Sequence, residues 1–127
     1  MTTAAKRILV VDDDEALLET TRATLEKEGY EVHLHQSVFG AVSMARRISP
    51  DLILLDINMP AMSGEELVAL LREGGASTCK QIVFYSSNDE SSLRYLTLHY
   101  GVRGYVCKGD PGQLKLRVSR YLAMGKS

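Results

Sequence analysis

Cysteine is scarce in this 127-residue sequence, which contains only Cys79 and Cys107. The two lie far apart and in none of the close spacings that bind zinc. With 45% hydrophobic residues, a chain of this length can bury a core without disulfide support. The scarcity excludes a disulfide-rich scaffold, and we expect both thiols to be reduced, as in a cytoplasmic protein.

The sequence also lacks an excess of charge and long apolar runs. Lys and Arg number 15 and Asp and Glu 16, a net charge of −1. This balance excludes a protein that wraps nucleic acid through bulk positive charge, so we expect no direct DNA binding. The apolar runs fall far short of the roughly 20 residues that cross a bilayer, so no membrane association is expected. Without a linker or repeat, we expect a single domain over residues 1–127, with its core at about 6–124.

Short apolar runs are what the sequence does contain. Four of them are continuous, at residues 8–11, 52–55, 82–85 and 105–107. Continuous runs rich in β-branched and aromatic residues predict strands that are buried on both faces. Residues 30–35 alternate between apolar and polar side chains, which predicts a half-exposed strand at an edge of the sheet.

Helical spacing of apolar residues fills the intervals between these strands. Gly29 is placed to end the first helix in a left-handed conformation. Ser37 is placed to cap a second helix, which Ser49-Pro50 should end. We expect the third and fourth helices at about 65–72 and 90–99.

The last helix has the clearest start signal. Asp110 is placed as its N-cap, Pro111 fits the first turn, and Gln113 can complete a capping box. Five strands would then alternate strictly with five helices. Because parallel strands need crossover helices, this order predicts a doubly wound α/β domain whose parallel sheet is covered on both faces.

Polar residues follow the predicted strands directly, at the edge where open α/β sheets bind ligands. They are Asp12, Asp13, Asp56, Ser86 and Lys108. Taken alone, an Asp after a strand is usually a turn residue or an N-cap, and we expect Asp14 to be an N-cap. Taken together, three carboxylates in one crevice would repel each other unless a cation joined them or one stayed protonated. Mg²⁺, which prefers carboxylate, water and phosphate oxygens, suits such a crevice.

Three stretches carry a resemblance to a known family: Lys6 to Asp14, Pro50 to Pro60 with Met62-Ser63-Gly64, and Gly101 to Lys108. In this order they resemble the receiver domain of two-component response regulators, and the similarity covers about residues 6–124. The resemblance implies a flavodoxin-like, chemotaxis-receiver-like fold. In that fold a five-stranded parallel sheet has the order 2-1-3-4-5 and is accompanied by five helices.

The resemblance also assigns roles to the acidic residues. Asp56 would be the phospho-acceptor, a carboxylate nucleophile that attacks phosphorus and forms an aspartyl phosphate. Asp13, Asp56 and the backbone carbonyl of Asn58 would bind Mg²⁺, and Asp12 would act on the ion through water.

Lys108 and Ser86 would serve the phosphoryl group itself. The resemblance implies that Lys108 pairs with this group and that Ser86 donates a hydrogen bond to it. Three carboxylates, Mg²⁺ and the lysine sum to about zero charge, so a phosphoryl group can be accepted without an uncompensated buried anion. Movement of Ser86 toward the phosphate would let Tyr105 turn inward. That turn would alter the surface made by the fourth helix, fifth strand and fifth helix.

The same resemblance implies partners. The phosphoryl group would come from a sensor histidine kinase or a histidine phosphotransfer protein. The altered surface would bind a downstream protein target or a second copy of the chain. Such a domain catalyses only its own phosphorylation and dephosphorylation, so it would not be an enzyme in the usual sense.

Charge is unevenly distributed along the chain. Residues 94–127 carry seven Lys and Arg against the single acid Asp110, a net +6, which leaves −7 for the remainder. One interpretation is intramolecular balance between basic and acidic helices. The other is that a basic output surface docks an acidic partner or a second copy.

Three positions depart from the family pattern. Gly109 follows Lys108 where members usually carry proline, typically after a cis peptide bond. A non-prolyl cis bond costs about 2.5–4 kcal/mol, so we predict a trans Lys108–Gly109 bond and a rearranged loop before the last helix. Ser63 stands where an acid is frequent, which we interpret as a surface change, and Ser86 keeps the hydroxyl of the commoner threonine.

Three other functions fit parts of the pattern. A flavin-binding module would need a cradle of Gly, Ser or Thr amides after the first strand, where residues 12–15 are four acids that would repel phosphate. A haloacid-dehalogenase-like phosphohydrolase would need a second Asp two residues after its nucleophile, where Asn58 stands. A pseudo-receiver that binds partners without phosphorylation stays open, although each residue type of the acceptor site is present.

Overall fold

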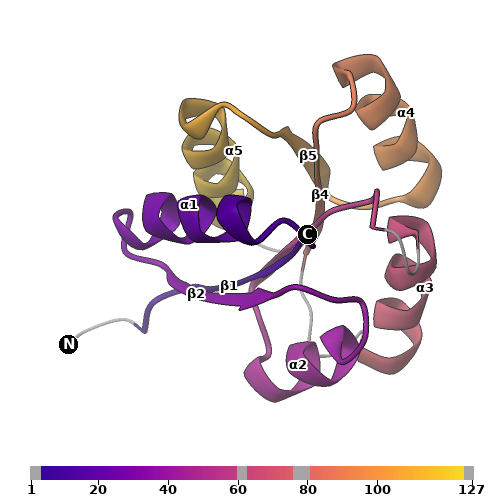
Figure 1. Cartoon of the computed structure of the whole chain (residues 1–127), viewed down its shortest axis with the longest axis horizontal. Coiled ribbons are helices and arrows are strands. Elements are labelled where there is room, and N and C mark those ends of the chain that lie inside the picture. Colours follow the sequence, from indigo (N-terminus) through magenta and orange to yellow (C-terminus); the bar gives the residue numbers. More distant parts are fainter. Residues whose placement is uncertain (1–3, 60–62, 76–80, 125–127) are drawn as a thin grey trace.

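Strands and helices alternate strictly along the chain in a computed structural model, which describes residues 4–59, 63–75 and 81–124 (Figure 1). Their bounds are β1 Arg7–Val11, α1 Glu15–Glu26, β2 Glu31–His35, α2 Ala41–Ile48, β3 Leu52–Leu55, α3 Gly64–Gly75, β4 Ile82–Ser86, α4 Glu90–Tyr100, β5 Gly104–Cys107 and α5 Pro111–Met124. This order confirms the predicted alternation.

All five strands form one parallel sheet in the order β2-β1-β3-β4-β5, as the resemblance implied. The alternating segment forms β2 at one edge, where Val32 is its only buried residue. The prediction of a half-exposed edge strand is therefore confirmed. The continuous apolar runs form the three inner strands and the other edge strand, β5.

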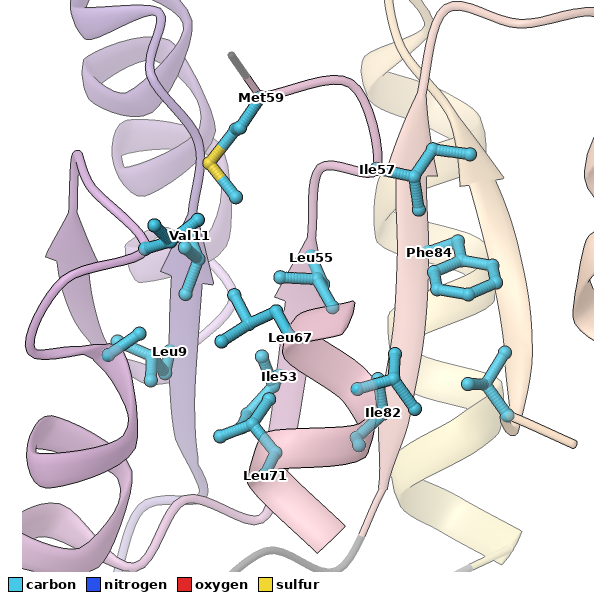
Figure 2. Close-up of a cluster of buried hydrophobic side chains, with 14 of the residues drawn as sticks. Leu9, Val11, Ile53, Leu55, Ile57, Met59, Leu67, Leu71, Ile82 and Phe84 are labelled. Atoms are coloured by element: carbon cyan, nitrogen blue, oxygen red, sulfur yellow. The ribbon is translucent and has the colours of Figure 1, made fainter. Parts of the chain in front are cut away.

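Each inner strand supplies two hydrophobic cores, because successive side chains point to opposite faces of the sheet. Leu9 and Val11 of β1 lie in the core beneath α2, α3 and α4, part of which Figure 2 shows. Ile8 and Val10 lie in the core on the opposite face, together with residues of α1 and α5. Burying one such aliphatic side chain contributes about 1.5–3 kcal/mol, so the two cores hold the strand ends in fixed relative positions.

Aspartates cap three of the helices, α1, α4 and α5. Asp14 Oδ1 accepts a hydrogen bond from Leu17 N at 3.1 Å, which confirms it as the N-cap of α1. Asp110 Oδ1 accepts from Gln113 N at 3.1 Å at the start of α5. The rest of the predicted capping box is wrong, since the side chain of Gln113 accepts instead from Cys107 N at 2.8 Å. This contact ties the start of α5 to the end of β5.

The start of the second helix differs from the prediction. Ser37 does not cap it, because the serine Oγ accepts from Phe39 N in a local turn. Gly40 is the N-cap instead, and its φ of +83° is a conformation that favours glycine. Ser49 ends the helix as predicted, and Gly29 after α1 adopts the predicted left-handed conformation.

The third helix is longer than expected and runs through Gly74 and Gly75. It is introduced by a reciprocal capping box, in which Glu66 N donates to Ser63 Oγ at 3.2 Å and Ser63 N donates to Glu66 Oε1 at 3.1 Å. Ser63 therefore caps α3, a structural role that our interpretation of this position as a surface change did not include.

Cys107 is a free cysteine, as expected, while Cys79 lies outside the described residues, as do Pro60 and Met62 of the resemblance. None of the helices in the described part of the chain combines the length and the apolar character needed to span a bilayer.

Candidate functional site

The register of the sheet brings the predicted site residues to one edge. Val11 and Leu55 are partners across β1 and β3, so Asp12 and Asp56 leave the sheet side by side. A backbone hydrogen bond fixes the relative position of these two strand ends, because Asp56 N donates to Val11 O at 3.0 Å. On the other side of β3, Lys108 N donates to Ser86 O at 2.9 Å.

Three carboxylates gather in this crevice, as the sequence predicted. Asp12, Asp13 and Asp56 each offer an oxygen, and these oxygens all lie within 4.8 Å of one another. Asp12 is 0% exposed and Asp56 is 3% exposed, whereas Asp13 is exposed. Two of the acids are therefore buried side by side, and the third lies where solvent reaches it.

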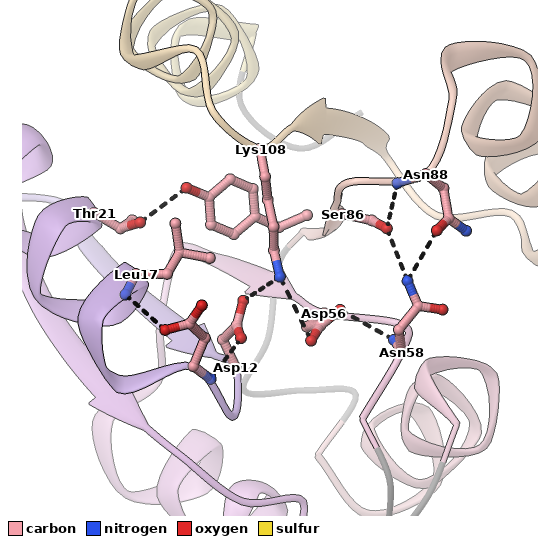
Figure 3. A network of polar contacts seen from close by, with 10 residues as sticks. Asp12, Leu17, Thr21, Asp56, Asn58, Ser86, Asn88 and Lys108 are labelled. Atoms are coloured by element: carbon pink, nitrogen blue, oxygen red, sulfur yellow. Dashed lines mark hydrogen bonds and ion pairs between the residues drawn. The ribbon is translucent and has the colours of Figure 1, made fainter.

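Lys108 neutralises part of this charge (Figure 3). Its Nζ lies 2.7 Å from Asp12 Oδ2 and 3.6 Å from Asp56 Oδ2. The closer contact is thus with Asp12, and not with the expected acceptor. Burial raises the pKa of Asp12, and the hydrogen bond from Lys108 opposes that rise without cancelling it. Burial alone would lower the pKa of Lys108, but its contacts with Asp12 and Asp56 raise it above its usual value.

Gly109 leaves the reach of Lys108 intact. The Lys108–Gly109 peptide bond is trans, as predicted, because none of the described residues has a cis peptide bond. Gly109 has a φ of +90°, a value that the ring of a proline forbids. The loop after β5 therefore takes a course that glycine permits and proline would not.

The donor set of the crevice fits a hard divalent cation. Three carboxylates supply the oxygen ligands that Mg²⁺ prefers, and one of them is open to solvent, from which the ion can keep several waters. Asp12 Oδ2 is buried, and among the described residues its only polar contact is the charge contact with Lys108. The single lysine leaves this cluster with a net negative charge, which a divalent ion would neutralise.

A network of amides holds the hydroxyl of Ser86, which is fully buried. Asn58 Nδ2 donates to Ser86 Oγ at 3.1 Å and to Asn88 Oδ1 at 3.0 Å. Asn88 N also donates to Ser86 Oγ at 3.1 Å, and Asn58 N donates to Asp56 Oδ1 at 3.0 Å. With two hydrogen bonds accepted, the proton of Ser86 is left for a further acceptor.

Sequence reasoning assigned only the carbonyl of Asn58 to the site and missed Asn88. The available signal was position, because Asn88 follows β4 by two residues at the same edge as Ser86.

Tyr105 joins three elements at one side of the crevice. Its hydroxyl donates to Glu90 Oε2 of α4 at 2.6 Å, and the guanidinium carbon of Arg117 of α5 lies 4.5 Å from the centre of its ring. The hydrogen bond from Tyr105 lowers the pKa of Glu90, and the charge of Arg94 lowers it further. At 8% exposure Tyr105 is buried. Sequence reasoning did not find Glu90 or the contact with Arg117.

Comparison with known proteins gives a consistent result. Residues 8–119 match the protein family described as the response regulator receiver domain. The DNA-binding response regulator MtrA of Mycobacterium tuberculosis is 34% identical over 119 residues, which cover 93% of this chain and 51% of that protein. The chain spans about half the length of the curated relatives it matches.

Solved structures show the same fold. The chemotaxis protein CheY4 of Vibrio cholerae has a TM-score of 0.82 and 28% identity, with 92% of this chain and 98% of that chain covered. The BeF3-activated N-terminal receiver domain of RstA from Klebsiella pneumoniae has a TM-score of 0.78 and 30% identity, with 91% and 96% covered.

Proposed function

The chain belongs to the family of response regulator receiver domains, and from this premise we propose that it accepts a phosphoryl group on Asp56. As a receiver domain it is not a classical enzyme. The acidic crevice carries the proposal, because it places a buried carboxylate, further oxygen ligands and an ammonium at one edge of the sheet. We propose that this domain occupies about residues 6–124.

Asp56 is the nucleophile in this proposal. One of its carboxylate oxygens forms a bond to phosphorus, the bond from phosphorus to the donor's histidine nitrogen breaks, and the electron pair stays on that nitrogen. The hydrogen bond from Asn58 N to Asp56 Oδ1, at 3.0 Å, fixes the orientation of the carboxylate before the attack. Transfer of this kind depends on position and charge neutralisation more than on further covalent chemistry.

Mg²⁺ would be held by Asp13, Asp56 and the backbone carbonyl of Asn58, with Asp12 acting through water. When bound, the ion neutralises charge on the transferring phosphoryl group. Lys108 lies 3.6 Å from Asp56, close enough to pair with a phosphoryl oxygen built on that carboxylate.

Ser86 and Tyr105 would carry the signal outward. The buried Ser86 hydroxyl can donate its free proton to a phosphoryl oxygen, and movement of the side chain toward that oxygen would weaken its contacts with Asn58 and Asn88. Tyr105 contacts both α4 and α5, so a change in its position would alter the surface made by α4, β5 and α5. A shift between two such states needs only a few kcal/mol of differential interaction.

The proposed donor is a sensor histidine kinase or a histidine phosphotransfer protein, and the proposed target of the altered surface is a downstream protein or a second copy. MtrA is named as a DNA-binding protein, but this chain covers about half of it, and the expectation that the chain itself does not bind DNA stays a prediction. A cytoplasmic location is also part of the proposal and agrees with the free thiol of Cys107.

Intact-mass spectrometry tests the proposal. The protein is incubated with Mg²⁺ and a small phosphoryl donor such as acetyl phosphate, and then with a phosphorylated histidine phosphotransfer protein. We expect the mass of one added phosphoryl group in the native chain and none in Asp56→Ala. Asp51→Asn is the matched control, because Asp51 precedes the opposite end of β3, and it should take up phosphate normally.

A lack of uptake from both donors would contradict the proposal and favour the alternative, a pseudo-receiver that binds partners without phosphorylation. Uptake that persists in Asp56→Ala would place the acceptor elsewhere.

A further inference from the structure

Tyr85 is a buried side chain beside Lys108 that the proposed reaction does not use. It lies in β4 directly before Ser86 and is 3% exposed, in the core shared by the sheet, α1 and α5. Lys108 Nζ lies over its ring, 5.7 Å from the centre. A lysine ammonium within about 6 Å of a ring centre is attracted by the electron-rich face of the ring.

A hydrogen bond fixes this ring from the other end. The hydroxyl of Tyr85 and Thr21 Oγ1 of α1 lie 2.8 Å apart, the contact drawn as a dashed line at Thr21 in Figure 3. Both side chains are buried. Burial also raises the pKa of Tyr85, so the phenol stays neutral and keeps this bond. Both residues line a cleft of about 190 Å³ between α1 and the β5–α5 loop. The hydrogen bond therefore fixes the hydroxyl end of the ring at the wall of this cleft.

The conformation of the loop after Lys108 explains why the contact with Tyr85 matters for the position of the ammonium. Gly109, at a φ of +90°, has no ring or side chain to restrict the backbone that carries the lysine. The lysine side chain is long and flexible, and its ammonium contacts Asp12 and Asp56 at unequal distances of 2.7 and 3.6 Å. The aromatic face of Tyr85 adds a third contact to the ammonium. Three contacts together restrict its position, which the backbone at Gly109 does not restrict.

We propose that Tyr85, anchored by Thr21, is a positioning residue that holds the Lys108 ammonium over the buried carboxylates. The inference rests on the proposed function, since it assigns Tyr85 a part in the same reaction. It extends that function by naming a side chain that compensates for the missing proline after the lysine.

Substitutions at Tyr85 and Thr21 test the inference through the rate of phosphoryl uptake from acetyl phosphate with Mg²⁺. Tyr85→Leu removes the ring, and we expect the rate to fall about three- to tenfold, which lies within the range that one cation–π contact supplies. Tyr85→Phe keeps the ring and should restore most of the rate. Thr21→Val breaks the same hydrogen bond as Tyr85→Phe and also keeps the ring, so it should lower the rate by the same small amount as Tyr85→Phe. An equal loss in the Phe and Leu variants would overturn the role of the ring.

Two controls separate positioning from general destabilisation. Leu25→Ala opens the same core at the far end of α1, away from the crevice, and should leave the rate unchanged. In a Lys108→Met background, Tyr85→Leu should lower the rate no further, because there is no ammonium left to position. An undiminished loss in that background would contradict the proposal.

A measurement without a phosphoryl donor separates this inference from the proposed function. Acetic anhydride acylates amines, and the rate at Lys108 can be followed by peptide mass spectrometry. We expect acylation of Lys108 to be several-fold faster in Tyr85→Leu than in the native chain or Tyr85→Phe, because the ammonium has lost one of its three contacts. Unchanged acylation in Tyr85→Leu would refute the positioning role even if phosphorylation occurs as proposed. Faster acylation without any phosphorylation would support the positioning contact and refute the proposed function.

Discussion

The crevice and the surface made by α4, β5 and α5 contain the same kinds of charged side chains in different surroundings. In the crevice, the Lys108–Asp12 pair is 2.7 Å long, and the two side chains are 16% and 0% exposed. On the surface made by α4, β5 and α5, the Arg94–Glu90 pair is 3.3 Å long, and its side chains are 66% and 54% exposed. Both are ion pairs by distance, and burial is what separates them.

This difference decides which charges influence the rest of the molecule. Water screens the exposed pair, and pairs of this kind contribute little to stability. The buried carboxylates have lost their hydration, so they depend on Lys108 and raise one another's energy. The crevice therefore carries uncompensated buried charge, which binding of a cation or a phosphoryl group would change. The ion pair on the surface carries no such charge.

Removal of the lysine should give the largest effect. Lys108→Met leaves the buried Asp12 and Asp56 without their cationic partner, and we expect the free energy of unfolding in Mg²⁺-free buffer to fall by about 3 kcal/mol. Urea titration measures this change. Added Mg²⁺ should recover part of the loss in the variant, since the ion neutralises the same carboxylates. An unchanged urea midpoint in Mg²⁺-free buffer would show that the buried carboxylates do not depend on Lys108 for stability.

An effect of pH should come next in size. Because the pKa of Asp12 is raised above its usual 3.8, the folded chain binds that proton more tightly than the unfolded chain. The contribution of Asp12 to stability therefore falls as pH rises from 3.8 through the folded pKa, and it stays low at neutral pH.

Asp12→Asn removes this penalty. In Mg²⁺-free buffer we expect the variant to unfold at a higher urea concentration than the native chain at pH 7, with a gain that shrinks as pH falls toward 3.8. The gain should be smaller than the loss in Lys108→Met. Asp51→Asn, which removes a half-buried carboxylate at the opposite end of β3, serves as the control. If Asp12→Asn were less stable than the native chain at pH 7, the change in the free energy of unfolding would have the opposite sign and would contradict the account.

The smallest effect should come from the surface pair. Arg94→Met removes a cation in the same way as Lys108→Met, but from a pair that water screens. We expect the unfolding midpoint and its dependence on salt to match those of the native chain within error. A loss as large as that of Lys108→Met would remove the distinction between the two regions.

Most of the fold and the main site residues could be predicted because their signals are local. Continuous apolar runs fixed the strands, and the polar residues after them had to meet at one edge of a parallel sheet. The start of α2 was predicted wrongly, because Ser37 and Gly40 lie in the same turn and either could precede the helix. The choice depends on a backbone conformation that sequence does not show.

The contacts that were missed are long-range. Tyr85 reads as one more apolar residue of a strand, and nothing in its neighbourhood indicates Thr21, which lies 64 residues earlier. Glu90 and Arg117 read as solvated helix residues, and only the packing of α4 and α5 around β5 brings them to Tyr105. Such pairings follow from tertiary structure, so single-residue patterns cannot give them.

The central claim is that the buried carboxylate of Asp56 accepts the phosphoryl group with the help of a cation. Borohydride reduces an aspartyl phosphate to homoserine, and fragment mass spectrometry locates the converted residue. After incubation with acetyl phosphate, the account predicts homoserine at position 56 when Mg²⁺ is present and none when the metal is chelated. Conversion at Asp12 or Asp13, or no conversion at any residue, would contradict it.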